Sequence, residues 1–208
     1  MLATVDALLP LSLLEAVRDV DTPADLDSEF VDELRNKRLG LSDTVYLQIK
    51  RYADAVKKNQ RAAHDESVGL ARLIGRRPDA EAVFRAAGRF LARESYRTIN
   101  PATRKLLRLL PAILARPIAL ARSRLLVERY ANGTVRRLGG YVLLDVPSSI
   151  TLSTAPGSIG CAYYEAMLRE LLRLLIGSVG SVDHVRCAGR GEGTCEWRAD
   201  WKAFDSHA

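Results

Sequence analysis

Cysteine, histidine and methionine are scarce in this chain: three cysteines, three histidines and two methionines occur among 208 residues. An odd number of cysteines argues against a secreted disulfide framework, so we expect reduced thiols in a cytoplasm of the bacterial type. No run of about 18 uninterrupted apolar residues occurs, and we therefore expect no membrane-spanning helix. The first residues include Asp6 and Glu15 and lack a basic segment, which argues against a signal peptide.

The chain also lacks the motifs of common catalysts. No glycine fingerprint of the G-x-G-x-x-G type follows a predicted strand, and no flavin signature occurs. Three cysteines are too few for an all-cysteine iron–sulfur cluster. No Ser-His-Asp arrangement can be placed, since the histidines outside the C-terminal segment are His64 and the near-terminal His207. We therefore favour a protein that is not an enzyme, and a conventional hydrolase is the least favoured class.

Apolar residues make up 48% of the chain, enough for a packed core in one domain with an N-terminal extension. We predict a helical arm over residues 1–40, in which apolar residues recur at helical spacing from Leu26 to Leu34. The arm either covers an apolar face of the domain or serves dimerisation. The remaining residues, 41–208, are predicted to form one α+β domain. Ser42, Asp79 and Asn100 are predicted helix N-caps.

The middle of the chain is basic. Residues 104–137 contain nine basic side chains and one acidic side chain, Glu128. Such a segment can lie on an anionic membrane surface, peripheral to the inner membrane, or face an acidic protein. A solvated arginine face on ordinary core helices is the alternative, which we favour, and Pro111 and Pro117 are predicted to split the segment into short helices. Nucleic-acid binding is disfavoured, because aromatic residues do not interleave with the arginines.

The pattern changes from helix to strand near Thr134. Residues 141–146 and 150–154 predict two antiparallel strands, and a long helix is predicted to start at Ser158 or Gly160 and to end at Gly177. Residues 182–188 and 194–201 then predict a hairpin with a glycine-rich turn. Phosphate binding by this turn is disfavoured, because no helix begins after it.

All three cysteines, Cys161, Cys187 and Cys195, lie in the C-terminal segment 158–202 together with His184. Their spacing, C-x22-H-x2-C-x7-C, offers four ligands for a tetrahedral zinc shell. In a regular strand His184 and Cys187 point to opposite faces, so the site needs either a strand that begins after His184 or a β-bulge. The alternative is that the cysteines are small core residues, and spacing alone leaves both interpretations open.

Asp183 is a competing metal ligand or a hydrogen-bonding partner of one. It lies four residues before Cys187 and would share its face in a regular strand.

Two motifs, GCAYYEAML from Gly160 and CAGRGEGTCEW from Cys187, resemble the 4-vinyl reductase-type domain. That family includes a small bacteriochlorophyll-biosynthesis protein and the sensor domains of phenol-responsive transcriptional activators, and its fold is similar to Bet3-like subunits of a vesicle-tethering complex. The resemblance is specific over residues 158–201, looser over 79–157, and covers almost nothing of 1–78.

The resemblance implies an α+β fold with helices on one side of a small antiparallel sheet, a homodimer, and an apolar cavity for a small hydrophobic molecule. It also implies a structural zinc ion held by Cys161, Cys187 and Cys195. The fourth family ligand is a carboxylate, and its position falls on His184, which is an acceptable zinc ligand.

We therefore expect a non-catalytic sensor or carrier stabilised by structural zinc. The residues expected to line its cavity, from helical periodicity and family analogy, are Phe84, Phe90, Leu110, Ile113, Tyr130, Tyr164 and Leu168. One alternative is an accessory protein or reductase in bacteriochlorophyll biosynthesis, acting on a tetrapyrrole vinyl group. Another is a scaffold or adaptor that docks on a membrane or an acidic partner through residues 104–137.

Overall fold

The fold combines a helical layer with two small antiparallel sheets, which confirms the predicted α+β class. A computed structural model describes residues 3–22, 40, 42–154, 156–177 and 180–200. The helix predicted near Leu26 to Leu34 and the strand residue Trp201 lie outside these residues. Within them, no helix has the length and apolar character needed to cross a bilayer.

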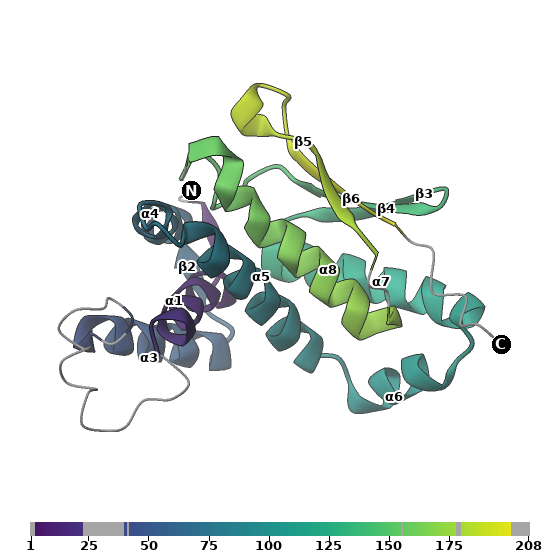
Figure 1. The fold of residues 1–208 in the computed structure, drawn as a ribbon. Helices are drawn as coiled ribbons and strands as arrows, with labels where there is room; N and C mark the ends of the chain where they lie inside the picture. The colour runs from purple at the N-terminus through teal and green to yellow at the C-terminus, as the bar shows by residue number, and fades with distance from the viewer. Residues whose placement is uncertain (1–2, 23–39, 41, 155, 178–179, 201–208) are drawn as a thin grey trace.

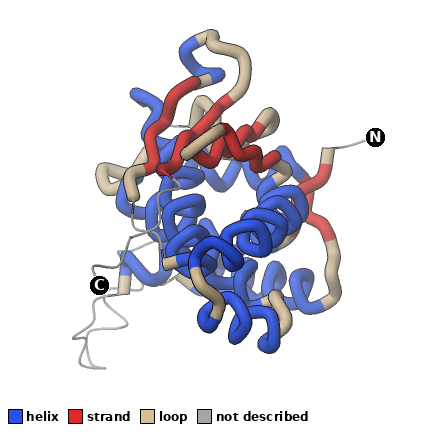
Figure 2. Tube along the Cα trace, turned by 90° about the vertical axis from the view of Figure 1, so that its right-hand side faces the viewer, coloured by secondary structure: helices blue, strands red, loops and turns tan. Residues whose placement is uncertain are grey.

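The larger sheet has four strands in the order β3-β4-β6-β5, and every neighbouring pair is antiparallel. Its strands are β3 (Thr134–Leu138), β4 (Tyr141–Val146), β5 (Val182–Arg186) and β6 (Cys195–Asp200). Alternate residues such as Val142, Leu144 and Trp197 are buried, because successive side chains of a strand point to opposite faces. The helices cover one face of this sheet (Figures 1 and 2).

Seven α-helices are present in the described part of the chain. They are α1 (Leu8–Asp21), α3 (Asp43–Lys57), α4 (His64–Gly75), α5 (Ala80–Arg97), α6 (Pro101–Leu109), α7 (Ala112–Ala131) and α8 (Ala162–Ile176). Two predicted N-caps are confirmed: the side chain of Ser42 accepts from the Val45 N–H at 3.2 Å, and that of Asn100 accepts from the Ala102 N–H at 2.8 Å. Asp79 precedes α5 without a side-chain cap bond, and its carboxylate accepts from Arg77 instead. Gly177 ends α8 in the left-handed conformation, with φ of 70°, which glycine adopts without strain.

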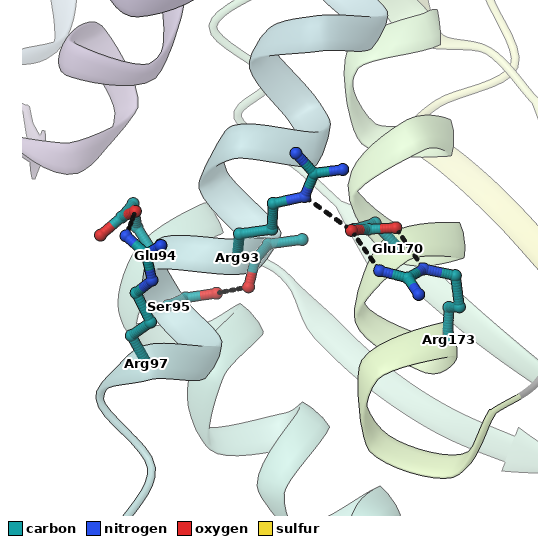
Figure 3. Close-up of polar contacts among 7 residues, drawn as sticks. Arg93, Glu94, Ser95, Arg97, Glu170 and Arg173 are labelled. Atoms are coloured by element: carbon teal, nitrogen blue, oxygen red, sulfur yellow. Dashed lines mark hydrogen bonds and ion pairs between the residues drawn. The ribbon is translucent and has the colours of Figure 1, made fainter.

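Helices α5 and α8 lie side by side beneath the sheet (Figure 1). Gly88 permits this approach, since a Cβ there would lie 2.0 Å from the carbonyl oxygen of Tyr163. The two helices are also joined by charge. Glu170 of α8 accepts hydrogen bonds from Arg93 of α5 at 2.8 Å and from its own helix's Arg173 at 2.7 and 2.9 Å (Figure 3). Backbone contact and charge pairing therefore fix the same helix pair.

The first helix is part of the core. Leu9 and Leu13 of α1 are fully buried, and Ser12 shares a 2.8 Å hydrogen bond with the buried Tyr163 of α8. Before α1 in the chain, β1 (Thr4–Asp6) pairs with β2 (Arg61–Ala63) in a second small sheet. The sequence did not predict this sheet. The predicted division of the chain at residue 40 stays a prediction.

The strand predicted over residues 150–154 is wrong, because these residues form turns. The hydroxyl of Ser149 accepts from the Thr151 N–H at 3.3 Å, and the Thr154 hydroxyl donates to the Thr151 carbonyl at 2.7 Å. Such local bonds compete with a strand ladder. Both edges of β4 are also occupied, by β3 and β6, so the sheet has no place for a further strand there.

Pro111 separates α6 from α7 as predicted, whereas the predicted break at Pro117 is wrong, because Pro117 lies inside α7. A proline in a helix removes the hydrogen bond to the carbonyl four residues earlier. Here that residue is Ile113, which is 80% exposed, so water can take the place of the missing donor.

Candidate metal centre

Cys161 stands where a turn of 3-10 helix (Pro156–Cys161) passes into α8. The turn packs closely on the preceding loop, since a Cβ on Gly160 would lie 2.3 Å from the carbonyl oxygen of Thr151. This contact fixes the position of the next residue, Cys161, whose side chain is buried. The N-terminal end of a helix stabilises negative charge, which favours a thiolate at this position.

A β-bulge sets the direction of the next two ligands. His184 of β5 pairs with Trp197 of β6, but Arg186 pairs with Glu196, so the register shifts by one between His184 and Arg186. One extra residue in a strand shifts the alternation of its side chains. Cys187, directly after β5, therefore returns to the side that His184 occupies. Of the two alternatives that the sequence left open, the structure shows the β-bulge.

Cys195 is the first residue of β6 and lies on the buried face of the sheet, opposite Val146 of β4. Trp197 is the next residue of β6 on that face, and its ring stacks on the His184 imidazole with centroids 4.8 Å apart. The predicted hairpin of β5 and β6 thus brings His184, Cys187 and Cys195 to one end of the sheet. The start of α8 supplies Cys161.

These four side chains form one cluster. The three sulfur atoms and one imidazole nitrogen all lie within 4.8 Å of one another. Bond lengths of about 2.3 Å to sulfur and about 2.0 Å to nitrogen place tetrahedral zinc ligands roughly 3.5–4 Å apart. Small side-chain adjustments therefore bring all four atoms onto one ion.

The donor atoms themselves fit a metal ion. All three cysteines are free thiols. The Nε2 atom of His184 is buried and has no hydrogen-bonding partner among the described residues. A buried polar atom without a partner is costly, and either nitrogen of a neutral imidazole can coordinate a metal while the other takes the proton.

The thiols interact strongly with one another. The pKa of Cys195 is lowered, chiefly because the Cys161 thiol hydrogen-bonds to its sulfur, with further help from the Ala188 N–H and His184 against the effect of burial. The pKa of Cys161 is raised, because its proton is held in that hydrogen bond and because its thiol is buried. The protein thus favours one thiolate at Cys195, and thiolates are the form of cysteine that binds metals.

Neighbouring groups hold the sulfur atoms in place. The backbone N–H of Ala188 donates to the Cys195 sulfur at 3.4 Å, and the Ser158 hydroxyl lies 3.5 Å from the Cys187 sulfur. The Glu192 carboxylate accepts from the Cys187 N–H at 2.6 Å and thereby closes the turn of the hairpin. Partners of this kind orient metal ligands.

Asp183 is not a member of the cluster. It pairs with Arg198 across the sheet, with Nη2 and Oδ2 3.5 Å apart, and it is half-exposed. Because the bulge lies between Asp183 and Cys187, the two residues no longer share a face. The competing-ligand interpretation of Asp183 is therefore wrong, and His184 is the fourth member.

The residues predicted to line a ligand cavity are placed in different surroundings. Phe84, Tyr164 and Leu168 are fully buried where α5 and α8 pack, and Tyr164 packs against Trp197. Ile113 is exposed to solvent. Of the other predicted cavity residues, Phe90 and Leu110 are partly buried and Tyr130 is buried. Tyr130 lines a cleft of about 270 Å³, whose other lining residues are Asp6, Val56, Asn59, Thr98 and Arg129.

Two clefts that the sequence did not predict open beside the candidate metal cluster. One has a volume of about 300 Å³ and the other of about 530 Å³, and both are lined by Ser158, Cys161 and Arg190. The larger one extends to Arg85 and Glu165, which form an ion pair of 2.7 Å between α5 and α8. No sequence pattern joins residues this far apart, so only the fold shows that they border the cluster.

A four-ligand site of this composition has a clear chemical limit. Three thiolates and one imidazole fill a tetrahedral shell, so no position remains at which water could be activated. A metal ion held by these four residues would cross-link the hairpin to α8. No family model, curated protein or solved structure matches the chain in comparisons with known proteins.

Proposed function

We propose that this protein is a non-catalytic binding module whose last hairpin is fixed to α8 by a structural zinc ion, and which serves as a sensor or carrier of a small hydrophobic molecule. One observation carries the proposal: Cys161, His184, Cys187 and Cys195 gather their ligand atoms within 4.8 Å. Zinc suits thiolate and imidazole ligands in tetrahedral geometry. The resemblance of this segment to the 4-vinyl reductase-type domain supports the same ligand positions.

The metal would stabilise the fold by joining elements that are distant in the chain. The hairpin of β5 and β6 is an edge of the sheet, with β6 alone connecting β5 to the other strands. A metal that binds the folded chain and not the unfolded chain stabilises the fold according to its affinity and concentration. The zinc ion therefore replaces part of the apolar packing that a larger hairpin would supply.

Chelation tests the structural role. The purified protein, treated with a strong chelator under reducing conditions, should melt at a markedly lower temperature, and added zinc should restore the original value. A Cys195→Ser variant should melt low with or without the chelator. An unchanged melting temperature after proven removal of the metal would refute the structural role.

Ligand binding makes a separate demand on the structure. Because Phe84, Tyr164 and Leu168 are fully buried, a hydrophobic molecule would have to separate α5 from α8 or the sheet to reach them. A ligand that binds only the folded state raises the melting temperature, and the increase grows with the logarithm of ligand concentration once that concentration exceeds the dissociation constant. Titration with phenol and with indole as probes should therefore raise the melting temperature. No shift with either probe would remove ligand binding and leave the zinc site untouched.

The proposed homodimer rests on the family resemblance. Native mass spectrometry of the freshly purified protein counts subunits, zinc ions and any small molecule that co-purifies. A dimer with one zinc ion per chain is the expected species, and a monomer at all protein concentrations would contradict the dimer.

A further inference from the structure

We propose that the corner formed by α6 and the start of α7 is a docking surface for an anionic lipid bilayer. The corner consists of residues 104–124. Its α6 part lies at the margin of the molecule, at the end opposite the four-residue cluster, and its α7 part runs along β3 (Figure 1). It is independent of the proposed zinc module, because none of its residues lines the cluster.

Large apolar side chains are exposed at this corner in unusual number. Leu106 and Leu109 of α6 are 46% and 72% exposed, and Ile113 and Leu114 of α7 are 80% and 56% exposed. In α6, Leu107 alone among the leucines is buried. The four exposed side chains lie within nine consecutive residues, two on each side of Pro111. Exposed apolar patches of this kind are typical of interaction sites.

The charges around the patch have one sign. The corner contains no acidic residue, and within the described residues none of its cations forms an ion pair with a carboxylate. The six cations are Arg104, Lys105, Arg108, Arg116, Arg122 and Arg124. Other arginines of the protein, such as Arg85 and Arg93, do form such pairs. Arg124 donates to the Val135 carbonyl of β3 at 3.1 Å and Arg104 lies over the Tyr96 ring, whereas Lys105 and Arg108 are exposed among the leucines. A partner that is both anionic and apolar would complement this part of the surface.

A lipid bilayer meets both requirements at one surface. Headgroup phosphates pair with arginine and lysine, while leucine and isoleucine side chains enter the boundary of the acyl chains. Long basic side chains can keep their charge at the headgroups while their stems lie on apolar surface. A second copy of the chain fits less well, because a twofold interface would place each patch, and its cations, against itself.

The test measures sedimentation of the full-length, zinc-loaded protein with vesicles. Vesicles that contain phosphatidylglycerol should bind the protein, vesicles of phosphatidylcholine alone should bind it weakly, and high salt should release it. Removing one charge, as in Arg108→Gln, should weaken binding by about fivefold. The double variant Leu109→Ser/Ile113→Ser should weaken it by at least about tenfold.

Leu138→Ser is the matched control, since Leu138 is 64% exposed on β3 and lies outside the corner. It should bind vesicles as the parent protein does, and all variants should melt at the parent temperature. Equal binding to neutral and anionic vesicles, or no binding, would overturn the proposal. So would vesicle binding that Leu109→Ser/Ile113→Ser leaves intact. Loss of a dimer in that variant, seen by sedimentation velocity without lipid, would assign the patch to a second copy of the chain and would also overturn it.

Discussion

The Sγ atom of Cys161 lies within 4.8 Å of the Sγ atom of Cys195, so the start of α8 meets the first residue of β6. α8 packs beneath the sheet, and β6 is a central strand of it. A metal bond between these residues would therefore join the two layers at one end of the sheet. His184 and Cys187 extend the same connection to the edge strand β5.

Replacement of His184 tests the fourth ligand. His184→Ala should weaken zinc binding by at least about 100-fold and should lower the melting temperature, because three ligands and a solvent molecule remain. His184→Cys should retain tight binding, since it restores four soft ligands. Competition with a coloured zinc chelator measures both affinities.

The matched control for this replacement is His64→Ala. His64 is outside the cluster, at the start of α4, where its Nδ1 atom lies 3.5 Å from the Asp65 carboxylate. The control should keep the parent affinity for zinc. Equal affinities for His184→Ala and the parent protein would exclude His184 as a ligand.

Two helix glycines make a matched pair for the packing of α5 on α8. Gly88→Ala should destabilise the protein by about 1–3 kcal/mol, because its Cβ would lie 2.0 Å from the Tyr163 carbonyl oxygen and 2.9 Å from the Met167 nitrogen. Gly69→Ala in α4 should stabilise it by about 0.5–1 kcal/mol, because no atom lies within 4 Å of the added Cβ. Urea unfolding measures both, and a Gly88→Ala protein as stable as the parent would contradict the close approach.

Acid should weaken the ion cluster at Glu170. Hydrogen bonds from Arg173, and then from Arg93, outweigh burial and lower the pKa of Glu170 from 4.5 to about 2. A depressed pKa in the folded state gives stability that is complete above the unfolded value and is lost as pH falls towards the folded value. Glu170→Gln should therefore destabilise the protein by about 1–2 kcal/mol at about pH 6, and the difference from the parent should shrink between pH 4.5 and pH 2.

Glu81→Gln controls for the general effect of acid. Glu81 pairs with Arg85 on α5 but is mostly exposed, so its replacement should cost little at any pH. Both variants are compared with the parent at equal zinc, because acid also releases metal from thiolates. A Glu170→Gln difference that does not change with pH would contradict the lowered pKa.

The members of the candidate metal cluster could be predicted from the sequence, because three cysteines and a histidine are rare residues gathered in one segment. Spacing alone left core packing of the cysteines as an alternative. The alternation of side chains along a strand predicted that His184 and Cys187 could share a face only with a bulge between them or with a strand that begins after His184. The alternation of side chains along a strand does not give the position of the bulge. Its placement between His184 and Arg186 excludes Asp183, and it depends on pairing with β6.

Apolar residues were harder to place, because helical periodicity gives the buried face of a helix but not what covers it. Phe84, Tyr164 and Leu168 are packed in the core, and their contact with a ligand stays a prediction. Ile113 has a similar pattern and is exposed. The strand predicted over 150–154 failed for a related reason, because β-forming residues there are held in turns by their hydroxyl groups and both edges of β4 are occupied.

X-ray absorption at the zinc edge, measured on the purified protein after addition of one equivalent of zinc, tests the central claim most directly. The proposed ligand set predicts three sulfur atoms at about 2.3 Å and one imidazole nitrogen at about 2.0 Å around each ion. These ligands are Cys161, His184, Cys187 and Cys195. A shell of oxygen and nitrogen atoms without sulfur, or a protein that retains no zinc after desalting, would contradict the account.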